Sequence, residues 1–317
     1  MIAIQPYQNQ SVDRAGSVSL QPTFAQTYQR IQRLVHHHLA FETLNERLAD
    51  LPHQFNSPKP RPWEAIDWHH IHPSQVIGVD VSVFCALLVG ALDTEAPIRG
   101  YTQTSRRYLE TLHPEMATFV GGTVQPDGAL IEPGLWEKEE RQHTPALLKV
   151  YLQLTGESIK PSLRVVRAYC PTANPRSDLY RHGVHRIATE YGATCLYLWM
   201  IAHSTGPLQA VFEELLMDEI NHMTKFWGFG TWAYPEARWW KTGYLLLRTM
   251  RHKNDPHNSL FRTLKRMAAV LKWSDWSLIN RCSFAIACLV VLHRMWAWNR
   301  RLSREWLTDL FGAVNNA

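Results

Sequence analysis

Two pairs of glutamate and histidine, each three residues apart, are the part of this chain best suited to chemistry. They are Glu140–His143 and Glu219–His222. Residues three apart on a helix share one face, so each pair can offer an oxygen and a nitrogen to one metal ion. Two such pairs, joined by one glutamate from each of two further helices, form the ligand set of a carboxylate-bridged di-iron bundle. The spacing therefore predicts a di-iron centre that activates oxygen.

Context separates these two pairs from a third, Glu110–His113. Both pairs interrupt apolar stripes with alternating steps of three and four, the pattern of a helix face packed in a core. The stripes are Trp136, Glu140, His143, Leu147, Val150, Leu154 and Leu208, Phe212, Leu215, Glu219, His222, Phe226, Phe229. The third pair is preceded by arginines and followed by Pro114, so we interpret it as a solvated helix end.

Two further acids, Glu95 and Glu190, also break apolar stripes. The order along the chain is then Glu, Glu-x-x-His, Glu, Glu-x-x-His, which matches the bundle ligand set. A carboxylate at a core position is costly to bury unless a metal ion or a cation neutralises it. The alternative is that these acids form buried ion pairs with arginines such as Arg141 or Arg186.

Composition limits the classes of protein to consider. Hydrophobic residues make up 45% of the 317 and charged residues 19%, which is typical of a globular chain. The net charge of +5 suits an acidic partner or an anionic membrane. Nucleic acid is not expected as a partner, because the chain has no dense Lys/Arg run and no nucleic-acid-binding motif.

Cysteine usage and the N-terminus predict a cytoplasmic protein. The five cysteines are odd in number, form no Cys-x-x-Cys, and mostly lie in apolar runs, as expected of buried thiols in a reducing compartment: Cys85, Cys170, Cys195, Cys282, Cys288. Residues 1–22 lack the charged start and apolar block of a secretory signal. The most apolar stretch, Cys282–Leu292, is too short to span a bilayer.

The elements that must position the acids are all predicted helices. Helical spacing covers residues 23–50, 76–113, 135–155, 180–204 and 206–228, and no strand pattern occurs. Pro- and Gly-rich loops are expected at 52–75, 121–134 and 156–178. We therefore predict an all-α fold, a four-helix di-iron bundle with additional N- and C-terminal helices. Its parts are a flexible arm (1–22), the bundle (23–230) and a helical extension (231–317) packed on the bundle or lying near a membrane surface.

Other histidines are not expected to bind metal. His36, His37 and His38 are consecutive in a helix, point in different directions, and are interpreted as surface residues. His69, His70 and His72 lie in the predicted loop, where no apolar frame would fix them.

Around the site the chain resembles the soluble acyl-carrier-protein desaturases of the ferritin-like superfamily. The matching segments span residues 60–230 and are Asp93–Thr94–Glu95–Ala96, Glu139–Glu140–Arg141–Gln142–His143, Glu190, and Asp218–Glu219–Ile220–Asn221–His222. The sequence departs from the family in having a single glutamate before Pro97. The C-terminal third has no traceable likeness to the family.

The resemblance implies how the residues would be used. Glu95, Glu140 and His143 would hold one iron and Glu190, Glu219 and His222 the other, with Glu140 and Glu219 bridging. Asp218 would orient a ligand histidine, and Trp63 or Trp68 would extend that network toward the surface. The resemblance also implies O2 as co-substrate, an electron donor such as ferredoxin, an acyl carrier protein as a partner, and a homodimer.

We therefore expect an O2-dependent oxidoreductase that desaturates or oxidises an apolar acyl chain. Three alternatives stay open at this point. The first is another di-iron enzyme on the same scaffold, such as an N-oxygenase, an aldehyde-deformylating enzyme or an amine hydroxylase. The second is an iron-handling protein without an organic substrate, and the third is a helical binding protein without metal. Carboxylate and imidazole ligands suit manganese as well as iron.

Overall fold

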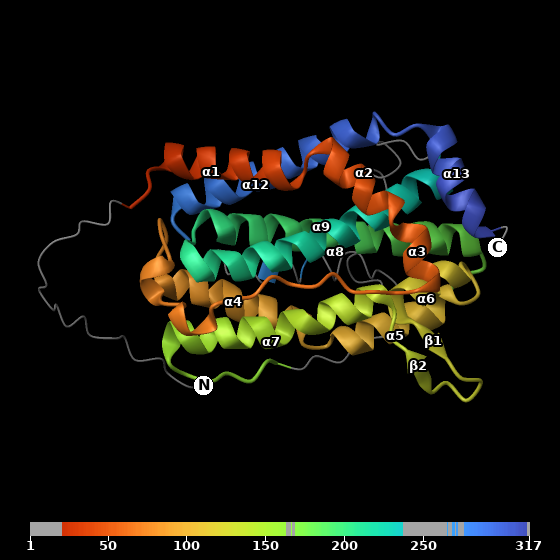
Figure 1. Cartoon of the computed structure of the whole chain (residues 1–317), viewed down its shortest axis with the longest axis horizontal. Helices are drawn as coiled ribbons and strands as arrows, with labels where there is room; N and C mark the ends of the chain where they lie inside the picture. The colour runs from red at the N-terminus through yellow and green to blue at the C-terminus, as the bar shows by residue number, and fades with distance from the viewer. Residues whose placement is uncertain are drawn as a thin grey trace, which may run out of the picture.

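The structure, a computed structural model, describes residues 21–162, 169–236 and 276–315, with a few isolated positions between them. These parts are predominantly helical, which confirms the predicted all-α class. In the view of Figure 1 the helices form three tiers, with α1 and α12 above, α8 and α9 in the middle, and α4 and α7 below.

Four helices carry the predicted ligands: α4 (Val81–Glu95), α7 (Leu135–Thr155), α8 (Pro175–Ala202) and α9 (Gly206–Ala233). They lie side by side, with α8 packed on α9, α4 on α7, and α7 on α9. Both stripes predicted from the sequence are buried along their whole length. The two acidic pairs therefore face the interior of the bundle.

The turn between α8 and α9 is tight and well fixed. Gly206 adopts a positive φ of 58°, a conformation that glycine tolerates without strain. Pro207 follows in the first turn of α9, where a missing N–H costs nothing.

An N-terminal layer covers one side of the bundle. The single helix predicted over 23–50 is instead two, α1 (Phe24–His38) and α2 (Phe41–Ala49), divided at Leu39 and Ala40. The predicted loop 52–75 starts within a further short helix, α3 (Leu51–Asn56), and contains two 3-10 turns at Trp68–His70 and Pro73–Gln75. Because α1 packs on α8 and α12, His38 is buried, and its interpretation as a surface residue was wrong.

The helix predicted over 76–113 begins later and is broken near Pro97. It becomes α4 and α5 (Ile98–Leu109), which meet at a bend of 40°. The proline ring removes a helical hydrogen bond and forces this break, which leaves Glu95 as the last residue of α4. Beyond α6 (Pro114–Gly121), the predicted loop contains a small hairpin that the sequence analysis missed, β1 (Thr123–Val124) paired antiparallel with β2 (Leu130–Glu132).

Two helices of the predicted C-terminal extension are described, α12 (Leu278–Asn299) and α13 (Arg304–Asn315). The first packs on α1 and α8 and the second on α9, as expected of an extension that covers the bundle. Nearly all of the predicted N-terminal arm (1–20) and residues 237–264 of the extension lie outside the described residues.

Two sequence predictions about the extension need correction. The apolar stretch at Cys282–Leu292 continues as the 22-residue helix α12, which is long and apolar enough to cross a membrane. The α4–α5 pair passes the same test if its two helices count as one span. All five cysteines are free, but Cys282 is exposed and Cys288 half-buried, so these two are not the buried thiols predicted.

His203 joins the α8–α9 turn to the segment before α4 and gives the fold a predicted pH dependence. Its Nδ1 lies 2.8 Å from the carbonyl oxygen of Ile77, while its buried Nε2 has no hydrogen-bond partner. Burial lowers the pKa of His203 to about 4, with a smaller contribution from Arg30. His203 takes up a proton near pH 6.5 in the unfolded chain but only near pH 4 in the folded protein. The free energy of unfolding therefore falls as the pH drops through this interval.

When the pH is lowered from 7 to 5, we expect the wild type to lose about 2 kcal/mol more unfolding free energy than His203→Gln loses. Chemical denaturation at the two pH values measures this difference. The exposed His69→Gln serves as the matched control and should leave the loss unchanged. An equal pH dependence in wild type and His203→Gln would contradict the assignment.

Candidate metal centre

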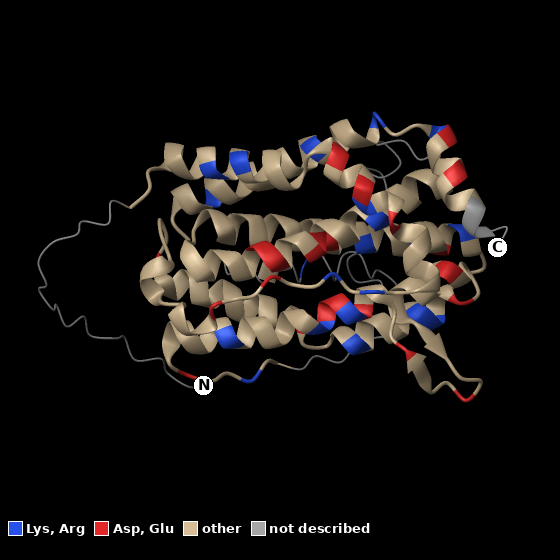
Figure 2. Cartoon of the chain, viewed as in Figure 1, with Lys and Arg blue, Asp and Glu red and all other residues tan. Residues whose placement is uncertain are grey.

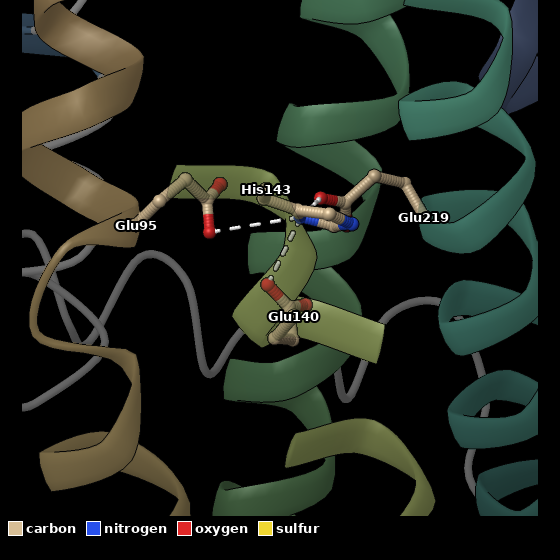
Figure 3. Close-up of side chains that lie close together, drawn as sticks. All are labelled: Glu95, Glu140, His143 and Glu219. Carbon is tan, nitrogen blue, oxygen red and sulfur yellow. Dashed lines mark ion pairs between the residues drawn. The ribbon is translucent and has the colours of Figure 1, made fainter. Parts of the chain in front are cut away.

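The six predicted ligands come from four helices and meet at one place. Glu95 ends α4, Glu140 and His143 lie on α7, Glu190 lies on α8, and Glu219 and His222 lie on α9. Figure 3 shows four of these side chains pointing toward one another. Their donor atoms form two overlapping groups, each with all atoms within 4.8 Å of one another: Glu95, Glu140, His143, Glu219 and Glu140, Glu190, Glu219, His222.

Glu140 and Glu219 belong to both groups. The two oxygens of Glu140 lie between the imidazoles, with Oε2 at 3.2 Å from His143 Nδ1 and Oε1 at 3.2 Å from His222 Nδ1. Glu219 Oε1 is 3.4 Å from His143 Nδ1. Glu190 belongs to the second group alone, with Oε2 at 3.7 Å from His222 Nδ1. This is the arrangement expected if Glu140 and Glu219 bridge two ions.

Glu95 is the most peripheral of the six. Its Oε2 is 3.9 Å from His143 Nδ1, and its Oε1 accepts a hydrogen bond from the Tyr197 hydroxyl at 3.3 Å. A second donor, Trp136 Nε1, binds Glu140 Oε1 at 2.8 Å. The sequence analysis did not assign either aromatic residue to the site. Trp136 precedes Glu140 by one helical turn, so its spacing was a usable signal, whereas Tyr197 comes from another helix.

The four carboxylates are buried and form no ion pair with a lysine or arginine of the described ranges. Arg141 binds Glu137, one turn earlier on the same helix, rather than Glu140. Arg186 donates to the Tyr169 hydroxyl and lies over the Trp136 ring. Among the described residues, neither arginine therefore pairs with the four carboxylates, and their basic neighbours are the two imidazoles.

This crowding of acids shifts the pKa values in the metal-free site. Burial, with repulsion from Glu140 second, raises the pKa of Glu95 to about 7. Burial and the charges of Glu140 and Glu190 raise the pKa of Glu219 well above its ordinary value. Burial also acts to raise the pKa of Glu140, but the two neighbouring imidazoles outweigh it and hold that pKa well below normal. The site therefore disfavours the charged forms of Glu95 and Glu219 when no cation is present.

Several buried nitrogen and oxygen atoms at the centre that could bind a metal ion have no hydrogen-bond partner. They are Nδ1 of His143, Nδ1 of His222, Oε1 of Glu190 and Oε2 of Glu219. An unsatisfied buried polar atom is costly, and four of them on residues of the two overlapping groups are hard to explain by packing. Two divalent cations would supply a partner for each atom and balance the four negative charges. The residues present therefore fit a pair of hard metal ions bound by oxygen and imidazole nitrogen.

Each histidine is oriented by an acid from the other Glu-x-x-His helix. His143 Nε2 on α7 lies 3.3 Å from Asp218 Oδ2 on α9, and His222 Nε2 on α9 lies 2.8 Å from Glu139 Oε2 on α7. A carboxylate on one ring nitrogen fixes the tautomer and leaves the other nitrogen, Nδ1, to face the site. Asp218 was predicted in this role. Glu139 was missed, although both acids directly precede the glutamate of a pair.

Arg61 and Trp63 complete this outer layer. Arg61 donates from Nη2 and Nε to Asp218 Oδ1 at 2.8 and 3.1 Å, and its backbone N–H donates to Glu139 Oε1 at 3.0 Å. Its Nη1 also pairs with the buried Glu214 at 2.5 Å. Trp63 Nε1 donates to Asp218 Oδ2 at 2.9 Å. Of the two tryptophans predicted for this network, Trp63 is therefore in place, while Trp68 lies under Lys149 instead.

Arg61 should matter strongly for stability. Replacing it with Met leaves the carboxylates of Asp218 and Glu214 buried without their cation, at a cost of about 3–5 kcal/mol. Urea denaturation of the metal-free protein measures this loss. Arg107→Met, at an exposed position on α5, is the matched control and should change stability by under about 0.5 kcal/mol. Similar small effects at both positions would show that Arg61 does not neutralise these acids.

The remaining polar candidates lie elsewhere. Glu110 is exposed at the end of α5, and His113 caps α6 by accepting a hydrogen bond from Met116, as expected of a helix end. His69, His70 and His72 are exposed. None of them approaches the six clustered side chains within the described part of the chain.

Comparison with protein-family models, with curated proteins and with solved structures finds no match. The assignment of the metal centre rests on its own geometry.

Proposed function

We propose that this chain is a di-iron oxidoreductase of the ferritin-like type that uses O2 to desaturate or oxidise an apolar acyl chain. One observation supports this most directly: four carboxylates and two imidazoles, all buried and without Lys/Arg partners in the part of the chain that the structure describes, converge in two groups that share Glu140 and Glu219. This is the ligand number and type of a carboxylate-bridged di-iron bundle.

The six ligands would be shared between two ions, and four further residues would hold the ligands in position. Glu95 and His143 would hold one ion, Glu190 and His222 the other, and Glu140 and Glu219 both. Asp218 and Glu139 would keep each imidazole turned with Nδ1 toward its ion. The Tyr197 and Trp136 donors would fix the rotamers of Glu95 and Glu140. Burial of all these groups excludes bulk water from the centre.

When bound, the ions would supply the reduction of O2 and the removal of hydrogen from an unactivated C–H bond, chemistry that no side chain performs alone. For a desaturation, a –CH2–CH2– unit, O2, two electrons and two protons give –CH=CH– and two water molecules. The two electrons must come from outside, and a ferredoxin-like donor is proposed for that role. An acyl carrier protein is the proposed carrier, because its acidic surface would suit a chain of net charge +5.

The first test is metal content and optical spectrum. The purified chain, loaded anaerobically with Fe²⁺ and then exposed to air, should retain about two irons and develop the near-ultraviolet absorption of an oxo-bridged pair. Mass spectrometry of acyl chains incubated with the reduced protein and O2 then tests the reaction. Loss of two mass units supports desaturation, and a gain of one oxygen supports hydroxylation.

Other results would lead to different conclusions. Iron uptake and oxidation without any change in acyl or amine compounds would favour iron handling without an organic substrate. Change in an amine or aldehyde alone would favour a different di-iron oxygenase. Protein that takes up neither Fe²⁺ nor Mn²⁺ would refute the metal centre and leave a helical binding protein.

A further inference from the structure

The outward face of α12 is a continuous apolar stripe. Its members recur at steps of three and four residues and are all exposed: Leu278, Cys282, Ala285, Leu289, Leu292, Trp296. Leu278 is 75% exposed, Leu289 65% and Trp296 51%. At 1.5 Å per residue the stripe is about 27 Å long. We call these six residues the apolar stripe. Such a stripe on a surface marks an interaction site.

The opposite face of α12 is fixed to the bundle. Its apolar residues are buried, and hydrogen bonds hold the helix to α2, α8 and α9. Tyr191 donates to the Cys288 carbonyl oxygen at 2.6 Å, Trp199 to the Ser283 hydroxyl at 2.9 Å, and Trp298 to the Asn45 side chain at 2.6 Å. Crossing a bilayer would break these contacts. The position of α12 instead suits a helix that lies along a surface, with its exposed face in contact with that surface.

The charge on α12 and on α1 beside it has one sign, although the neighbouring α2 exposes Glu42 and Glu46. Neither α12 nor α1 beside it contains an Asp or Glu, and Figure 2 shows only blue segments among the charged positions of these two helices. Arg300, Arg301 and Arg304 follow the stripe directly and are exposed. We call these three the arginine cluster. Glu305, next to Arg304 in the sequence, accepts a hydrogen bond from Ser303.

The arginine cluster is also joined to the aromatic end of the stripe. The Arg300 guanidinium lies 5.2 Å from the centre of the Trp296 ring, and that of Arg301 lies 3.9 Å from the Phe41 ring. Neither arginine pairs with a carboxylate among the described residues. Exposed tryptophan beside arginine is typical of groups placed at the boundary between lipid headgroups and acyl chains.

We propose that the apolar stripe and the arginine cluster form a docking surface for an anionic lipid bilayer. The stripe would enter the boundary between headgroups and acyl chains, and the arginine cluster would meet anionic headgroups. A second copy of the chain fits less well, because its own α1 and α12 contain basic residues and no acid and would carry the same charge. This proposal does not depend on the metal centre, although lipid surfaces are where apolar acyl chains gather.

Vesicle co-sedimentation of the full chain tests the proposal without any activity measurement. The vesicles are neutral phosphatidylcholine, alone or with about one third phosphatidylglycerol, at low salt and at about 0.5 M salt, where charges are screened beyond about 4 Å. The variants are Leu289→Gln/Leu292→Gln in the stripe and Arg300→Gln/Arg301→Gln in the cluster. Matched controls are Ile131→Gln, which is 63% exposed on the hairpin, and Arg107→Gln on α5.

We expect the wild type and both controls to bind the anionic vesicles, more weakly at high salt. The affinity of each double variant for the anionic vesicles should be at least about tenfold lower than that of the wild type. Its circular dichroism spectrum and melting temperature should be unchanged. Absence of wild-type binding, or equal binding by the stripe variant, would overturn the proposal. So would a wild-type dimer that the stripe variant converts to monomer without any vesicle binding, because the stripe would then be a contact between copies.

Discussion

Replacing Glu219 with Ala should reduce the metal content of the purified protein from about two ions per chain to almost none. Glu219 contributes to both groups of donor atoms, so its loss weakens both sites at once. Glu140→Ala should have the same effect for the same reason. Elemental analysis after Fe²⁺ loading and desalting measures the change.

The same substitution distinguishes loss of a ligand from loss of the fold. In the metal-free protein Glu219 is one of four crowded carboxylates, and its pKa is raised by burial and by Glu140 and Glu190. The raised pKa means that the fold disfavours the charged form of Glu219, so its loss removes no stabilising negative charge. Metal-free Glu219→Ala should therefore melt no more than a few degrees below metal-free wild type. Glu110→Ala is the matched control from the third Glu-x-x-His pair and should keep both ions. Full iron content in Glu219→Ala and Glu140→Ala would refute the ligand assignment.

Metal loading should raise the melting temperature by roughly 10–20 °C. An ion that binds only the folded protein stabilises it by about 4 kcal/mol when its concentration is a thousand times its dissociation constant. Two sites then give about 8 kcal/mol, and chains of this size gain about 2 °C per kcal/mol. Differential scanning calorimetry of metal-free and Fe²⁺-loaded protein, both anaerobic, measures the shift.

A chelator should reverse this stabilisation. The Glu219→Ala variant provides the control for weak binding of iron elsewhere, because its melting temperature should not change on loading. An equal rise in wild type and Glu219→Ala would show that the stabilising ions lie outside the proposed centre. No rise in either would argue against a metal centre of any strength.

The residues inside the bundle could be predicted well from the sequence, because the apolar period of each helix indicates which of its faces is buried. Glu140 and His143 interrupt an apolar stripe whose period matches a helix, so their burial could be expected from α7 alone. The prediction that Glu95 and Glu190 join the site required only the order of the four helices along the chain. The structure brings all six together, at positions that helical spacing already favoured.

The outer layer of the site could not be predicted in the same way. Arg61 lies in an irregular segment and reaches Asp218 and Glu214, more than 150 residues away, so no local period reveals it. The division between α1 and α2 falls at Leu39 and Ala40, where no Gly or Pro marks a break. His38 is buried because α1 packs on other helices, and no pattern within α1 indicates which flank they cover.

The crossed arrangement of the orienting acids has a consequence for how the centre would fill. Asp218 on α9 positions a ligand on α7, and Glu139 on α7 positions a ligand on α9, while Arg61 contacts both acids. An ion at either site would therefore help to order the imidazole and the shared carboxylates of its neighbour. Such linkage is reciprocal, and ordering by the first ion would help the second ion to bind. A titration would then be steep, and chains carrying a single ion would be scarce at every stage of loading.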